Sequence, residues 1–270
     1  MPLEIDFTDK TVLVVGGTSG VCRGIAERFA TLGAKVAVAS RKQEKVDETV
    51  AALQKLGAQA FGFAADVREF EPLDAGIAAT HRLLGDFDVV VSGAAGNFPA
   101  LLRDLSPNGF RSVVDIDLRG TFHVMKSIYP RLRKPGACVI NISAPQAYLP
   151  IQAQVHVCAA KAGVDMITRT LALEWGADGV RVNSVVPGPI DGTEGMARLA
   201  PTDAARQTVI GAVPLGRMGL PVDIANACVF LASELGAFVT GAVLPVDGGW
   251  SQTHCGTLGD ALSQYSGRRG

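Results

Sequence analysis

The sequence predicts a single α/β domain built on a doubly wound parallel sheet of about seven strands, with helices on both faces. Short apolar runs rich in Val and Ile recur along the 270 residues. They are continuous rather than alternating, which is typical of strands buried on both faces of a parallel sheet. Segments with an apolar spacing of about 3.6 residues lie between them. No repeat or linker interrupts this alternation, so we expect one domain over residues 1–270.

The expected strands, in chain order, are Thr11–Val15, Lys35–Ala39, Ala58–Ala64, Asp88–Val91, Cys138–Ile142, Arg181–Val186 and Ala242–Val246. The clearest helical segments are Ile25–Leu32, Val46–Leu56 and Val155–Trp175. Residues 188–218 are rich in Gly, Pro and small residues and follow a strand, so we expect a lid over a ligand, with a plain surface insertion as the alternative. The tail, residues 251–270, is expected to pack on a neighbouring subunit or to fray.

Composition and charge exclude several classes of protein. With 48% hydrophobic residues, 19% charged residues and a net charge of −1, the chain is neither disordered nor suited to binding nucleic acid. No apolar run approaches the ~20 residues of a membrane span, and the N-terminus does not resemble a signal peptide, so we expect no membrane partner and a cytoplasmic location. The five cysteines are scattered without zinc spacing, which predicts reduced thiols and no metal site.

A glycine-rich turn follows the first expected strand and leads into a helix. It reads Gly16-Gly17-Thr18-Ser19-Gly20-Val21-Cys22-Arg23-Gly24. Glycines at such a turn let the backbone approach a pyrophosphate, whose charge is favoured at the helix N-terminus. A glycine-rich turn alone is weak evidence, but its place between strand and helix strengthens it. We therefore expect a dinucleotide to contact Gly16, Thr18, Ser19, Gly20 and Val21.

The end of the second expected strand indicates which dinucleotide binds. Ser40, Arg41 and Lys42 stand where an NAD enzyme would place an acidic residue to bind the ribose 2′-hydroxyl. A hydroxyl and a planar cation suit a 2′-phosphate instead. The alternative is a helix that merely begins with a serine cap. We expect Ser40 and Arg41 to select NADP(H).

The spacing Gly16-x3-Gly20 resembles the Thr-Gly-x3-Gly-x-Gly turn of the short-chain dehydrogenase/reductase family. Val15 stands where the family usually has Thr, and Cys22 replaces its last Gly. The resemblance covers roughly residues 8–250 and implies a Rossmann fold. It also implies that Asp66 contacts the adenine. Further cofactor contacts are implied for Val67, Ala95, Gly96, Lys161, Pro187, Gly188, Ile190 and Thr193.

The catalytic positions of this family are largely changed here. Carbonyl reduction in the family uses an Asn, a Ser, and a Tyr four residues before a Lys. Lys161 matches the lysine, but Val157 stands at the tyrosine position. Ala144, beside Ser143, stands at the serine position, and Asp117 replaces the asparagine. We therefore do not expect ordinary carbonyl reduction.

This pattern is similar to that of the 2,4-dienoyl-CoA reductases, and closest to the peroxisomal type. The shared stretches are Ala94-Ala95-Gly96-Asn97-Phe98, Asp115-Ile116-Asp117, Gln154-Val155-His156, Pro187-Gly188-Pro189-Ile190 and Gly192-Thr193-Glu194-Gly195, while Ser92-Gly93 replace the more usual asparagine pair. The resemblance implies a homotetramer that uses NADPH to reduce 2,4-dienoyl-CoA to 3-enoyl-CoA in unsaturated fatty acid β-oxidation. Because the proton is needed at a carbon near the thioester, the tyrosine is dispensable. The resemblance implies that Asp117 and Lys161 hold a water that supplies this proton.

Substrate contacts are also implied by the resemblance, for Arg68, Asn97, Phe98, Ser143, Gln154 and His156. Structural roles are the alternatives: Phe98 as core, Gln154 and His156 as satisfied polar residues, and Arg68 as a solvated cation. For Asp117 the alternative is an acid on a helix surface. Tyr148 lies thirteen residues before Lys161 and is not expected to be the acid. Two other functions stay open. One is a diverged short-chain reductase of another carbonyl or enoyl substrate, favoured if Tyr148 or Ser143 reached the nicotinamide; the other is a non-catalytic NADP-binding protein.

Overall fold

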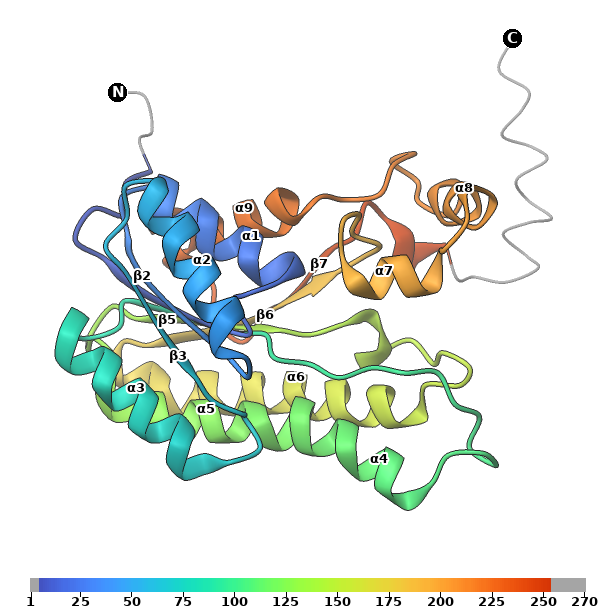
Figure 1. Ribbon diagram of the computed structural model, residues 1–270, viewed down its shortest axis with the longest axis horizontal. Coiled ribbons are helices and arrows are strands. Elements are labelled where there is room, and N and C mark those ends of the chain that lie inside the picture. Colours follow the sequence, from blue (N-terminus) through green and yellow to red (C-terminus); the bar gives the residue numbers. More distant parts are fainter. Residues whose placement is uncertain (1–4, 254–270) are drawn as a thin grey trace, which may run out of the picture.

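The computed structural model describes residues 5–253, and these form one parallel sheet between two layers of helices (Figure 1). Within this range seven strands pair in the order β3-β2-β1-β4-β5-β6-β7, and all neighbours are parallel. The strands are β1 Thr11–Val15, β2 Lys35–Ser40, β3 Ala60–Ala64, β4 Val89–Ser92, β5 Cys138–Ile142, β6 Arg181–Pro187 and β7 Val243–Val246. The predicted doubly wound Rossmann sheet is confirmed.

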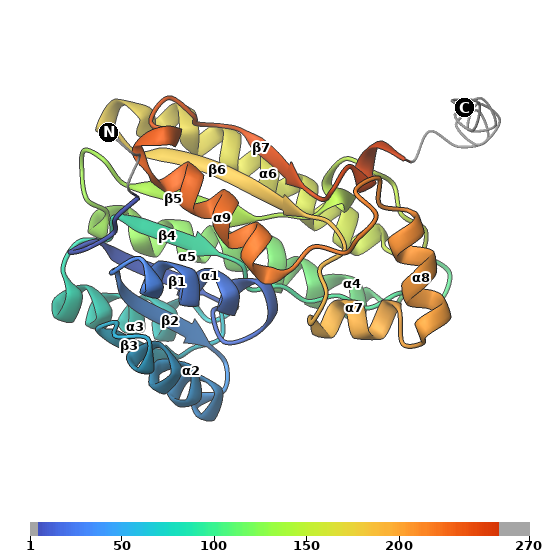
Figure 2. The same ribbon diagram turned by 90° about the horizontal axis from the view of Figure 1, so that it is seen from above.

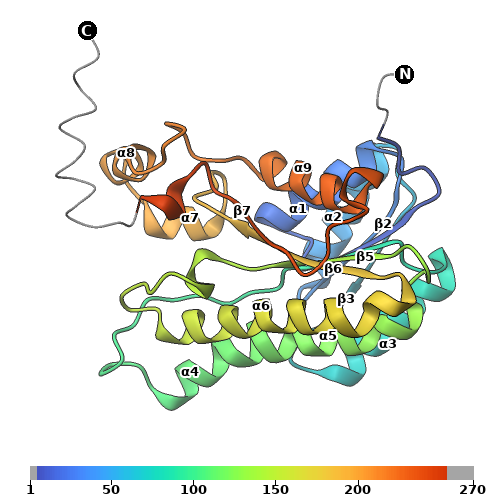
Figure 3. The same ribbon diagram turned by 180° about the vertical axis from the view of Figure 1, so that it is seen from behind.

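The helices cover both faces of the sheet (Figure 3). On one face lie α1 Gly20–Thr31, α2 Gln43–Lys55 and α9 Pro221–Ala232; on the other lie α3 Phe70–Leu84, α4 Pro107–Val114, α5 Gly120–Ile128 and α6 Val155–Trp175. Side chains alternate between the faces along each strand, so Val12 and Val14 enter the first core and Leu13 enters the second. Both sets are apolar because both faces are covered. The prediction that the strands are buried on both faces is wrong only for β3 and β7, which are partly exposed strands at the edges of the sheet.

The strand order reverses direction at β1, which pairs with β2 on one side and β4 on the other. In such sheets ligands bind beyond the carboxyl ends of the strands at this reversal. The segment predicted as a lid lies at that end of the sheet (Figure 2). It contains two helices that its composition did not indicate, α7 Glu194–Leu199 and α8 Asp203–Gly211. Met196, Ala200 and Met218 form a small core within it.

Two expectations concern the chain ends and the membrane. Residues 251–253 belong to a helical turn, Trp250–Gln252, and the residue after it, whereas the rest of the predicted tail and Cys255 lie outside the described residues. Among residues 5–253, no helix combines the length and the apolar character required to cross a bilayer.

Candidate active site

The glycine-rich turn lies where β1 and β4 diverge. Gly16 has a φ of 83°, and a Cβ there would stand 2.8 Å from the backbone nitrogen of Ala94, so only glycine fits. Helix α1 then begins at Gly20, with no acidic residue in its first turn. Its free N–H groups and positive dipole end favour an anion. The turn therefore fits the pyrophosphate of a dinucleotide.

Two cavities adjoin this turn. One, of about 250 Å³, is lined by residues that include Gly16, Ser19, Val21, Ser40, Arg41, Asp66, Val67 and Ala95. The other, of about 330 Å³, is lined by residues that include Ser19, Gly20, Val21, Pro187, Gly188, Ile190 and Thr193. Of the predicted cofactor residues, Thr18, Gly96 and Lys161 alone line neither cavity. Thr18 is buried in the turn, and the other two contact Asp117, as described below.

The first cavity carries positive charge next to β2. Arg41 is exposed beyond the end of that strand, and no acidic residue stands beside it at positions 40 to 42. Arg68 binds the Asp66 carboxylate through Nε at 3.0 Å and Nη2 at 2.6 Å. These hydrogen bonds, with the charge of Arg41, lower the pKa of Asp66. The structure thus places Arg68 beside the predicted adenine contact, and its contact with an acyl-CoA stays a prediction.

The two departures in the turn are accommodated by their neighbours. Val15 is buried at the end of β1. The Cys22 sulfur lies 3.8 Å from the carbonyl oxygen of Gly93, and a Cβ on Gly93 would stand 2.3 Å from that sulfur. The thiol therefore occupies space that a side chain at position 93 would need. Burial raises the pKa of Cys22 to about 12, so this thiol stays protonated and unreactive.

Asp117 is presented by a π-helical turn between α4 and α5. This turn, Asp115–Arg119, is a local feature that is frequent at functional sites. Asp117 is 1% exposed, whereas Asp115 is more accessible and lies 3.6 Å from Arg119. The sequence predicted the carboxylate at this position but not the π-helical geometry.

The structure brings Asp117 and Lys161 together. Asp117 Oδ2 lies 3.5 Å from Lys161 Nζ, and both side chains are buried. Asp117 Oδ1 accepts a hydrogen bond from the backbone N–H of Gly96 at 2.7 Å, and Lys161 Nζ donates to the carbonyl of Ile142 at 2.9 Å. Asp117 Oδ2 has no hydrogen-bond partner within the described residues. Because buried polar atoms are normally paired, this oxygen and the ammonium together suit a small polar molecule such as water.

No phenol stands at the position four residues before Lys161. Val157 is buried there and has no acidic proton. Ser143 follows β5 and is buried, with no partner for its hydroxyl among the described residues. Tyr148 is 43% exposed, and burial of part of its ring raises its pKa while Ser251 lowers it. The acid of an ordinary carbonyl reductase is therefore missing from this position.

Four predicted substrate residues lie together beside the start of α6. Gln154 Nε2 points to Asn97 Oδ1 at 3.5 Å, and the rings of Phe98 and His156 are 4.7 Å apart in an edge contact. His156 is fully buried, and neither of its ring nitrogens has a partner within the described residues. Gln146, which the sequence reasoning missed, donates to Gln154 at 2.5 Å.

Two further features of the region bear on its chemistry. An apolar cavity of about 360 Å³ lies beside these residues and is lined by Ala100, Leu102, Pro150, Ile151, Gln152, Ala153, Val155 and Cys158. Asp165, also missed, is buried one helical turn after Lys161. Its only sequence signal is an acid four residues after the lysine on an apolar helix face. Residues 5–253 hold no group of three or more potential metal ligands.

Comparison with known proteins finds a family model described as enoyl-(acyl carrier protein) reductase over residues 15–251. The chain is 42% identical over 250 residues to a peroxisomal 2,4-dienoyl-CoA reductase, (3E)-enoyl-CoA-producing, of Arabidopsis thaliana, covering 89% of this chain and 84% of that protein. It is 36% identical over 243 residues to a Bacillus subtilis protein named probable 2,4-dienoyl-CoA reductase, (2E)-enoyl-CoA-producing, covering 89% and 96%. A solved short-chain dehydrogenase of Bacillus anthracis is 36% identical, with a TM-score of 0.81 and coverage of 90% and 96%.

Proposed function

Since the chain belongs to the short-chain dehydrogenase/reductase family of nicotinamide-dependent oxidoreductases, we propose that it reduces 2,4-dienoyl-CoA thioesters to 3-enoyl-CoA with NADPH. This activity serves the β-oxidation of unsaturated acyl chains. The observation that carries the proposal is the buried Asp117–Lys161 pair, which stands in a site without a phenol at the usual position. Relatives named 2,4-dienoyl-CoA reductases support the substrate class.

The chemistry of dienoyl reduction explains why the Asp117–Lys161 pair can supply the proton without a tyrosine. When bound, the nicotinamide supplies a hydride to the far end of the conjugated thioester, and negative charge then spreads toward the thioester oxygen. A proton must next reach a carbon, so no acid is needed beside a developing alkoxide. Lys161 and Asp117 hold and orient a water at that carbon, and the Lys161 ammonium stabilises the negative charge nearby. Delivery at the carbon next to the thioester gives the 3-enoyl product.

NADPH is favoured over NADH by the charge at the end of β2. A 2′-phosphate would meet the Ser40 hydroxyl and the Arg41 guanidinium, while the only carboxylate lining that cavity, Asp66, is already bound by Arg68. Arg binds phosphate through several N–H donors, which gives both energy and orientation. We place the acyl chain in the apolar cavity that is lined in part by Leu102 and Val155.

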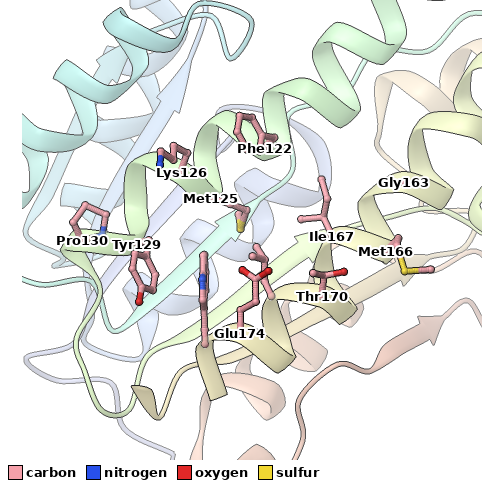
Figure 4. A pocket seen from close by; sticks show the side chains of 12 residues that line it. Phe122, Met125, Lys126, Tyr129, Pro130, Gly163, Met166, Ile167, Thr170 and Glu174 are labelled. Atoms are coloured by element: carbon pink, nitrogen blue, oxygen red, sulfur yellow. The ribbon is translucent and has the colours of Figure 1, made fainter. Parts of the chain in front are cut away.

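The outer faces of α5 and α6 support self-association. An apolar groove of about 800 Å³ lies between them, with Phe122, Met166 and Tyr129 at its surface (Figure 4). Its lining also includes Lys126 and Glu174, whose opposite charges suit a two-fold contact with a second copy. We place the predicted homotetramer contact here, and the mass of the particle in solution tests it. A cytoplasmic location stays a prediction.

Turnover assays with purified protein test the proposed function. Oxidation of NADPH is followed with trans,trans-2,4-hexadienoyl-CoA and with its 2,4-decadienoyl analogue, beside controls with NADH and with acetoacetyl-CoA. We expect turnover of the dienoyl thioesters with NADPH and little with the controls. Activity on acetoacetyl-CoA alone would instead support a diverged carbonyl reductase. Binding of NADPH without turnover of either thioester would support a non-catalytic protein.

A further inference from the structure

A group of buried polar side chains lies between α6 and strands β5 and β6, and we call it the α6 seam. Its members are Asn141, Ser143, Lys161, Asp165, Thr168 and Ser184, and each is at most 5% exposed. Thr168 hydrogen-bonds Asn141 at 2.9 Å and Ser184 at 2.8 Å, so the inner end of the seam is ordered. The outer end reaches the reaction centre at Lys161.

Asp165 is the acidic member of the seam, and the mechanism above does not use it. It lies four residues after Lys161, on the same buried face of α6. The hydroxyls of Ser143 and Ser184 face its carboxyl group. Even so, Asp165 Oδ1 and Ser143 Oγ lack hydrogen-bond partners among the described residues. Neighbouring buried polar atoms without partners are a place where ordered water is held.

The charged and polar groups around Asp165 do not offset the effect of its burial on its pKa. Burial raises its pKa, and this effect prevails over Ser143 and Ser184 and over the positive charges of Arg169 and Lys161, which lower it. The carboxyl group therefore retains its proton to a higher pH than a solvated aspartate does. A group of this kind can give up a proton when a stronger base forms beside it.

We propose that Asp165 is a proton reservoir that resupplies the Asp117–Lys161 pair after each turnover. The inference rests on the proposed function. When the bound water gives its proton to the substrate carbon, the hydroxide that remains takes a proton from the Lys161 ammonium. The Lys161 amine recovers one from Asp165 through the Ser143 hydroxyl or a bound water, and Asp165 recovers one from solvent. One solvent proton enters per product, and no group changes charge over the cycle.

Removing the ionisable group of Asp165 is expected to lower activity and to raise stability. The folded pKa of Asp165 lies above its unfolded value, so this group's contribution to stability is complete below the unfolded pKa and is lost as the pH rises through the folded pKa. Asp165→Asn keeps the shape but does not ionise. It is therefore expected to raise Tm at neutral and alkaline pH relative to the wild type, while kcat falls about tenfold with both KM values little changed.

The experiment compares Asp165→Asn and Ser143→Ala with the wild type. Thr168→Val is the matched control, because it removes a hydroxyl of the α6 seam beyond Asp165. The readouts are kcat against pH, the solvent isotope effect on kcat, and Tm against pH. A fourth readout is the carboxylic acid C=O band of Asp165 in infrared difference spectra of the ligand-free wild type and Asp165→Asn.

Loss of the C=O band in Asp165→Asn, a larger solvent isotope effect in both variants and an unchanged pH profile in Thr168→Val would support the reservoir. Wild-type kcat and pH profile in Asp165→Asn would overturn it, as would a lower Tm at all pH values together with an unchanged isotope effect, which marks a structural role. If the wild type does not reduce dienoyl-CoA, the proposed function fails, while the infrared and Tm readouts still decide whether Asp165 holds a proton.

Discussion

The two ends of the cofactor cleft differ in how they use charge. Next to β2, Arg41 and Arg68 are exposed or partly exposed, and Arg68 carries a bidentate bond to Asp66 near solvent. At the other end, Asp117 and Lys161 are buried, and Asp117 Oδ2 has no hydrogen-bond partner among the described residues. Solvent and salt weaken the interactions of exposed charges, whereas buried charges interact strongly at short range. We therefore expect a substitution next to β2 to have a smaller effect than one at the Asp117–Lys161 pair.

The largest effect is expected at the buried end. Asp117→Asn keeps an acceptor for the Gly96 N–H but removes the charge next to Lys161. We expect kcat to fall about a hundredfold, with the Kd for NADPH within twofold, because a general acid–base group contributes on this scale. Asp115→Asn, two residues earlier in the same π-helical turn, is the control for local disturbance. Near-normal turnover in Asp117→Asn would remove this residue from the mechanism.

A smaller effect is expected at the exposed end. Arg41→Ala should raise the Kd for NADPH about tenfold at low salt and leave the Kd for NADH nearly unchanged, because one charge-assisted contact to the 2′-phosphate is lost. Titration calorimetry at two salt concentrations measures both, with Arg111→Ala on the distant α4 as the control. Equal losses for the two cofactors would mean that Arg41 does not read the 2′-phosphate. In that case the residues next to β2 would not determine the choice between NADPH and NADH.

The smallest effect on the reaction is expected at the packing of Cys22 on Gly93, where a substitution acts on the stability of the fold. Gly93→Ala should destabilise the fold by about 1–3 kcal/mol, because the new methyl overlaps the sulfur. In a Cys22→Ala background the same change should cost much less, and denaturant unfolding of the four proteins gives the coupling energy. Additive effects would show that the two positions do not share this space.

Local pattern predicted much of the fold and part of the site. Strands β1 and β5 begin and end where their Val- and Ile-rich runs do, and the glycine turn stands where its spacing placed it. Asp117 and Lys161, which are 44 positions apart in sequence, were paired by family resemblance rather than by spacing. Their separation in space depends on the π-helical turn, which no periodicity indicates.

The features that sequence reasoning missed depend on contacts between distant segments. Asp165 could not be identified from the sequence because its environment depends on Ser143, which follows β5, and on Ser184 in the middle of β6. The packing of the Cys22 side chain against Gly93 likewise brings together residues that are 71 positions apart in sequence. Helices α7 and α8 are stabilised by the small core around Met196 and Met218 rather than by strong local periodicity.

We propose that this site delivers a solvent proton to carbon without a phenol beside Lys161. The most direct measurement is the reaction of 2,4-hexadienoyl-CoA with NADPH in D2O, with NMR and mass spectrometry of the product. We expect one solvent deuterium, at the carbon next to the thioester of a 3-enoyl-CoA. Deuterium at the fourth carbon of a 2-enoyl-CoA, or no reduction of the diene, would contradict it.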